Sequence, residues 1–114
     1  MRPGKSRCME RSAHMALALD AARDAAQRGE VPVGAVVVSP EGRVLAVRGN
    51  ETRATHDPSA HAEVQAIRAA CAMLGQERLP GASLYVTLEP CAACAGVIAA
   101  ARTACTSAWA DGSC

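Results

Sequence analysis

The first quarter of the chain has apolar residues at helical spacing, with charged residues between them. This pattern predicts a helix from about Ser6 to Arg28, and Gly29 follows it as a residue suited to a helix C-cap. The apolar positions that carry the pattern are Met9, Ala13, Ala16, Leu17 and Ala21.

The remaining elements are predicted from shorter patterns. Two β-branched or alternating runs, residues 33–38 and 44–49, flank a Ser-Pro-Glu-Gly turn and predict a β-hairpin. A helix over residues 59–74 is expected to bury Ala62, Ala66, Ala69, Ala70 and Met73. A strand over residues 83–88 then leads into a helix from Pro90 to about Arg102. Strands alternating with helices predict an α/β sandwich.

The last part of the chain gives a weaker signal. Residues 103–110 could form a strand, but few of them are bulky and apolar. Residues 1–5 are expected to be disordered. Residues 1–114 are predicted to form one domain, because this length builds a single core and no linker or repeat interrupts it.

The composition indicates where the protein is located better than it indicates what the protein does. The net charge of +1 gives no argument from bulk charge for a nucleic-acid partner, although eleven of the twelve basic residues are arginine. No stretch approaches the ~18 apolar residues of a membrane span, and no signal-peptide pattern is visible. A reducing, cytoplasmic location is therefore expected, with four of the six cysteines as free thiols: Cys8, Cys71, Cys105 and Cys114.

The other two cysteines belong to a metal-binding pattern. Cys91 and Cys94 lie three residues apart after Pro90, so both thiols would share one face at the start of a helix. The positive end of the helix dipole favours the thiolate form, which is the form that binds metal. Thirty residues upstream, His61 and Glu63 supply an imidazole and a carboxylate. H-x-E followed by P-C-x-x-C is the known signature of zinc deaminases.

This pattern predicts a catalytic zinc ion held by His61, Cys91 and Cys94, because three protein ligands leave a fourth position open for water. Glu63 would then act on that water as general base and later as general acid. The side chains of residues two apart on a helix point about 200° away from each other, so His61 and Glu63 cannot both reach a zinc ion beside one flank of the helix. The site is therefore expected beyond the N-terminal end of the helix that carries His61.

Other uses of the same residues stay open. A structural zinc site would need a fourth protein ligand, and His56, Cys71 and Cys105 are possible donors. A C-x-x-C pair can also be a redox pair, which would leave His61 and Glu63 without a role.

Four segments resemble the bacterial tRNA-specific adenosine deaminases, which belong to the cytidine deaminase-like superfamily. They are Glu30–Val36, Gly49–Asn50, Asp57–Glu63 and Leu84–Gly96, and the similarity extends over roughly residues 13–102. The resemblance implies a three-layer α/β/α sandwich with a mixed sheet. It also implies zinc ligation by His61, Cys91 and Cys94, with proton transfer by Glu63.

The resemblance further implies an activity and its partners. The activity would be conversion of adenosine to inosine at the anticodon wobble position, and the substrate would be a tRNA anticodon stem-loop. Asn50 would contact the flipped base, and the protein would assemble as a homodimer. Deamination of a free base or nucleotide (cytosine, guanine or dCMP) is the alternative, because those enzymes share the zinc motif. The family continues after Arg102 with an apolar strand and a long helix, so the chain is expected to be C-terminally truncated, and an inactive zinc-binding remnant is a further alternative.

Overall fold

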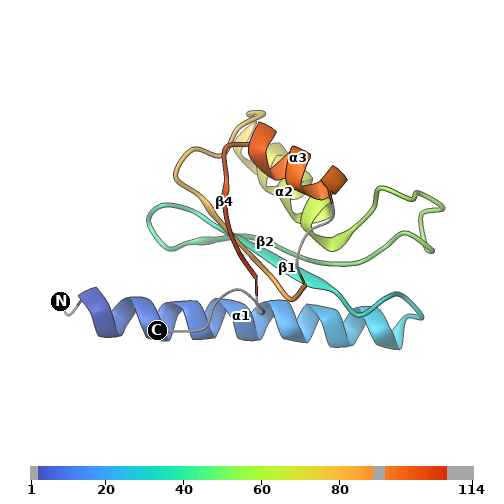
Figure 1. The fold of residues 1–114 in the computed structure, drawn as a ribbon, viewed down its shortest axis with the longest axis horizontal. Coiled ribbons are helices and arrows are strands. Elements are labelled where there is room, and N and C mark those ends of the chain that lie inside the picture. Colours follow the sequence, from blue (N-terminus) through green and yellow to red (C-terminus); the bar gives the residue numbers. More distant parts are fainter. Residues whose placement is uncertain (1–2, 89–91, 108–114) are drawn as a thin grey trace.

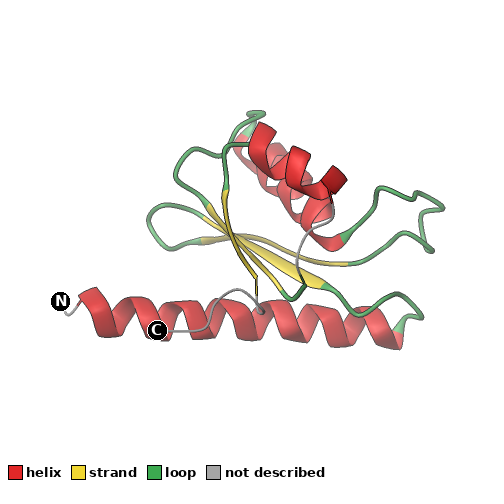
Figure 2. Ribbon diagram, in the orientation of Figure 1, coloured by secondary structure: helices red, strands yellow, loops and turns green. Residues whose placement is uncertain are grey.

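The computed structural model describes the backbone of residues 3–88 and 92–107 and the side chains of residues 11–88 and 94–104. Within these ranges the chain forms three layers, as Figures 1 and 2 show. Helix α1 (Pro3–Gln27) covers one face of a four-stranded sheet, and helices α2 (Ala62–Leu74) and α3 (Ala92–Ala100) cover the other. The predicted α/β/α sandwich is confirmed. No helix among the described residues is long and apolar enough to cross a membrane.

The sheet has the strand order β2-β1-β3-β4 and is mixed, as expected. Strands β1 (Gly34–Val38) and β2 (Val44–Gly49) form the predicted antiparallel hairpin, and β1 also pairs antiparallel with β3 (Ser83–Val86). Strand β4 (Ala104–Ser107) lies parallel to β3, with α3 as the crossover that a parallel connection requires.

Two apolar clusters hold the layers together, one on each face of the sheet. Alternation along β1 sends Ala35 and Val37 into the cluster under α2 and α3, and sends Val36 and Val38 into the cluster under α1. All five residues of β1 are buried, which is the pattern of a strand covered on both faces.

Helix α1 begins earlier than the sequence predicted. It starts at Pro3 and therefore includes three of the five residues expected to be disordered; proline is compatible with a first helical position because its missing N–H would have no partner there. The buried residues of α1 are Ala18, Ala22 and Ala25, whereas Leu17 is exposed, although it contributed to the apolar pattern.

The later helices differ from the predicted ones mainly at their ends. Helix α2 starts at Ala62 rather than near residue 59, and Gly75 ends it in the left-handed conformation. The expected burial of Ala62, Ala66 and Ala70 is confirmed. Met73, however, is exposed, since the helix face that meets the sheet is completed by two β-branched residues instead, Val64 and Ile67.

Small residues allow α1 to approach the sheet closely at Gly34. A Cβ atom at this position would lie 1.9 Å from the backbone oxygen of Ala18 and 2.7 Å from the backbone nitrogen of Ala22. Neither contact can be relieved by a side-chain rotation, because both partners are backbone atoms of α1. A glycine is therefore required where β1 passes beneath the helix.

We expect Gly34→Ala to lower the free energy of unfolding by at least about 1–3 kcal/mol, the usual cost of overpacking. Gly96→Ala is the matched control, since a Cβ there meets nothing within 4 Å and alanine favours a helix interior by up to about 1 kcal/mol. Urea unfolding of both variants measures the difference. Equal midpoints for Gly34→Ala and the unchanged chain would contradict the close approach.

Candidate active site

A cavity of about 250 Å³ lies at the N-terminal end of α2, next to the ends of β1 and β2. Three residues singled out from the sequence, Asn50, His61 and Glu63, line it together. Its other lining residues had no role assigned from sequence: Val31, Val33, Thr52 and Leu88. Their only signal was their position within or beside the four segments that carry the family resemblance.

His61 is the N-cap of α2, whereas the sequence predicted that it would lie in the first turn. Its backbone is extended (φ −72°, ψ 154°) and its side chain makes no capping hydrogen bond. Nδ1 of the imidazole instead lies 3.1 Å from Sγ of Cys94, a residue 33 positions away. Cys94 is fully buried in the first turn of α3. Tertiary folding therefore brings the imidazole and one of the two thiols together.

The pair fits the chemistry of a zinc site. Zinc binds histidine nitrogen at about 2.0–2.1 Å and cysteine sulfur at about 2.3 Å, so two such ligands at a tetrahedral angle lie about 3.5 Å apart. The observed separation of 3.1 Å is a few tenths of an ångström shorter. Cys91, the third expected ligand, lies outside the described residues.

Two of the three possible fourth ligands are described, and neither belongs to this cluster. His56 is exposed on the loop before α2, and Cys71 is half-buried in the last turns of α2, far along the helix from His61. The side chain of Cys105 is not described. Among the described residues, no group of three or more metal-binding side chains is assembled.

Glu63 is buried, with 4% of its surface exposed, and it is the second residue of α2. A carboxylate in the first turn interacts favourably with the positive end of the helix dipole. No side chain or backbone N–H among the described residues donates a hydrogen bond to it. Its oxygens are thus available to a molecule in the cavity that it lines.

Asn50 is buried and uses half of its amide to support the site. Its Oδ1 accepts a hydrogen bond of 3.1 Å from the backbone N–H of Ala62, one of the N–H groups that a helix start leaves without an internal partner. Asn50 thereby supplies the cap that the His61 side chain does not. No described residue accepts a hydrogen bond from its NH₂ group, so this group can donate to a ligand in the cavity.

The loop between Asn50 and His61 is ordered by an aspartate turn. Oδ1 of Asp57 accepts hydrogen bonds from the hydroxyl of Ser59 (2.7 Å) and from its backbone N–H (2.9 Å). These bonds, the side-chain bond foremost, lower the pKa of the Asp57 carboxyl below its ordinary value of 3.8. The turn delivers the chain to His61.

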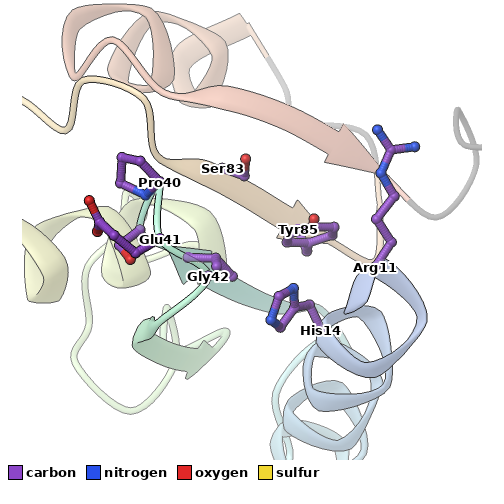
Figure 3. A pocket seen from close by; sticks show the side chains of 9 residues that line it. Arg11, His14, Pro40, Glu41, Gly42, Ser83 and Tyr85 are labelled. Atoms are coloured by element: carbon purple, nitrogen blue, oxygen red, sulfur yellow. The ribbon is translucent and has the colours of Figure 1, made fainter. Parts of the chain in front are cut away.

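A second cavity, of about 340 Å³, lies away from these residues, between α1, the β1–β2 turn and β3 (Figure 3). His14 lines it and packs against Tyr85, with ring centroids 5.1 Å apart. The cavity contains none of the motif residues. Three of the residues singled out from the sequence, Asn50, His61 and Glu63, line the cavity beside α2 instead.

Comparison with known proteins agrees with this geometry. The tRNA-specific adenosine deaminase of Agrobacterium fabrum is 60% identical over 93 residues, which cover 82% of this chain and 60% of that protein. A solved chain from a study of A-to-I editing by tRNA:A34 deaminases at the wobble position of transfer RNA superposes with a TM-score of 0.79 at 55% identity, covering 84% of this chain and 71% of that one. Guanine deaminase from Bacillus subtilis gives a TM-score of 0.78 at 36% identity, covering 84% and 63%.

This chain thus spans about 60% of the length of the A. fabrum relative. The family of the cytidine and deoxycytidylate deaminase zinc-binding region matches residues 9–108, which include every residue of the candidate site. The chain belongs to that family of zinc-binding deaminases.

Proposed function

We propose that this chain is a zinc-dependent hydrolytic deaminase domain that converts adenosine to inosine at the wobble position of a tRNA anticodon. The observation that carries the proposal is the 3.1 Å approach of His61 Nδ1 to Cys94 Sγ, beside a cavity that Glu63 also lines. A redox role for the cysteine pair would require neither the imidazole nor the buried carboxylate.

In this proposal His61, Cys91 and Cys94 hold the zinc ion. One imidazole and two thiolates form a common zinc donor set, and they leave a coordination position open. Bound there, zinc supplies Lewis acidity that makes water a usable nucleophile near neutral pH.

Glu63 moves the protons. It accepts one proton from the attacking water and passes it to the ring nitrogen beside the reacting carbon. It then takes the second proton from the hydroxyl that now stands on that carbon and delivers it to the departing amine, so that water and adenosine yield inosine and ammonia. A single carboxylate can serve both steps because Glu63 lines the cavity that would receive the base. Asn50 orients the base by donating a hydrogen bond from its NH₂ group to an acceptor on the base edge.

Two features favour a base that remains attached to RNA over a free base. The relatives with the higher identities act on tRNA by name, at 60% and 55% identity, against 36% for the guanine deaminase. The cavity wall also includes two exposed apolar side chains, Val31 (53% exposed) and Leu88 (41% exposed), so this wall faces outward and can receive a base turned out of a polynucleotide. The homodimer, the cytoplasmic location and the single domain over residues 1–114 belong to the same proposal.

Elemental analysis and a deamination assay test the proposal together. We expect one zinc ion per chain, and inosine formation on an anticodon stem-loop with adenosine at the wobble position. The same stem-loop with guanosine at that position is the control substrate. Turnover of guanine, cytosine or dCMP with none on the stem-loop would select a free-base or nucleotide deaminase, and stoichiometric zinc without any turnover would select a non-catalytic zinc protein.

A further inference from the structure

Glu30 is a buried acidic residue that none of the proposed chemistry uses. It lies between the end of α1 and the start of β1, and 6% of its surface is exposed. Its carboxylate bonds to a segment more than twenty residues away: Oε1 accepts from the backbone N–H of Arg53 at 3.1 Å, and Oε2 accepts from the backbone N–H of Ala54 at 2.7 Å.

A third hydrogen bond joins the same two segments, and here the side chain comes from the loop and the backbone group from the segment before β1. Nη1 of the Arg53 guanidinium donates to the backbone carbonyl of Gly29 at 2.9 Å. Among the described residues, no cationic side chain forms an ion pair with Glu30, so the two backbone N–H groups are what offset the cost of burying its charge. We call these three bonds the Glu30 clasp.

The clasp joins the chain neighbours of two residues that line the candidate substrate cavity. Glu30 precedes Val31 and Arg53 follows Thr52, and both Val31 and Thr52 line the cavity. The clasp therefore ties the backbones of two cavity walls to each other.

Beyond the clasp, the loop is attached to the rest of the fold near its two ends. Nε2 of Gln65 donates to Glu51 at 2.7 Å, and Arg68 lies 4.0 Å from Asp57. Asn50 N–H bonds to the carbonyl of Val33, and Glu51 N–H bonds to the carbonyl of Ala60, where the loop closes on itself. The residues from 53 to 56 are exposed. His56 holds a left-handed backbone (φ 53°), a conformation that costs a non-glycine residue energy unless its surroundings fix it.

We propose that Glu30 is a positioning residue: its carboxylate holds the loop after Asn50 against the segment before β1, and so sets the width of the cavity that receives the base. This inference rests on the proposed function for its substrate, but the clasp itself can be tested without turnover. Because Asn50 starts the loop and Thr52 lines the cavity, loosening the clasp displaces the wall that contacts the substrate and leaves the zinc ligands in place.

The rate of trypsin cleavage after Arg53 reports on the clasp, because the N–H of the Arg53–Ala54 peptide bond is the group bound to Oε2 of Glu30. Cleavage after Arg43, another exposed arginine, at the start of β2, provides an internal reference within the same chain. We expect Glu30→Gln and Glu30→Ala to accelerate cleavage after Arg53, relative to cleavage after Arg43, by about tenfold or more, as the loss of hydrogen bonds to a charged group implies. Glu77→Gln, a change in an exposed carboxylate after α2 that is distant in sequence from both cleavage sites, is the control and should leave this ratio unchanged.

The full chain is then assayed for zinc and for deamination of the stem-loop. The expected result for Glu30→Gln is one zinc per chain and a KM raised about tenfold or more, with a smaller change in kcat, and Glu30→Asp should recover part of the effect. An unchanged Arg53-to-Arg43 ratio, an equal rise at both sites, or an unchanged KM would each overturn the inference. If the unaltered chain deaminates nothing, the proposed function fails, whereas the cleavage ratio still decides whether Glu30 holds the loop.

Discussion

Replacing Glu63 with glutamine is expected to abolish deamination while leaving zinc bound. General acid–base catalysis by one positioned group contributes about 10²–10⁴-fold, and we expect a larger loss here because both proton transfers use this carboxylate. Glutamine keeps the shape of the side chain but can neither accept nor deliver the proton. The measurement is kcat on the anticodon stem-loop, together with elemental analysis of the same sample.

Two comparisons make this result specific. Glu41→Gln removes an exposed carboxylate in the β1–β2 turn and should leave kcat unchanged. Glu63→Ala should be as inactive as Glu63→Gln, because the carboxylate is missing in both variants. If Glu63→Gln kept more than about a hundredth of the activity, another group would be the base and the assignment of Glu63 would be wrong.

Removing a zinc ligand is expected to have the second large effect, on metal content and on stability together. His61→Ala, Cys91→Ala and Cys94→Ala should each lower zinc from one per chain toward none. They should also lower the melting temperature, because a metal that binds only the folded state stabilises it. For a chain of about this size, each kcal/mol lost lowers the melting temperature by roughly 4 °C or more. Elemental analysis and calorimetry of the same preparations measure both effects.

Cys71 provides the matched control for the cysteine variants. Burial in α2, and after it the negative charge of Glu77, raise the pKa of the Cys71 thiol above its ordinary value of 9.0. The thiol therefore stays protonated near neutral pH, and a protonated thiol is a poor metal ligand. Cys71→Ala should keep a full complement of zinc. Full zinc in Cys94→Ala, or lost zinc in Cys71→Ala, would contradict the proposed ligand set.

The residues around the cavity are held in place by contacts between different segments of the chain. Asn50 caps α2 from a distant segment, and the imidazole of the N-cap residue His61 lies against α3. Gly34 brings β1 under α1 without a side chain, and its N–H donates to the hydroxyl of Thr87, just beyond β3. Each of these contacts joins residues far apart in the sequence, so the positions of the site residues depend on the whole domain being folded.

The order of the elements and the identity of the chemical groups can be read from the amino-acid sequence alone. Periodicity in the apolar positions is a local property, so it placed three helices and three strands in the observed order, including the hairpin, and gave only a weak signal for the fourth strand. The spacing of the H-x-E and C-x-x-C motifs can also be read along the chain, and it indicates zinc chemistry without reference to the fold. Helix ends were less certain: α2 begins three residues later than predicted, because an N-cap is defined by backbone conformation rather than by residue type alone.

Which of these groups come into contact depends on how the chain folds. The wall residues of the cavity come from segments spread between residues 31 and 88, the Glu30 clasp joins segments more than twenty residues apart, and no periodicity in the sequence relates them. The weakly apolar β4 is a strand because backbone pairing with β3 supplies its hydrogen bonds, whatever its side chains. Leu17 and Met73 are exposed because the close approach of helix to sheet selects small or β-branched side chains at the contact, so hydrophobicity alone could not identify the buried face.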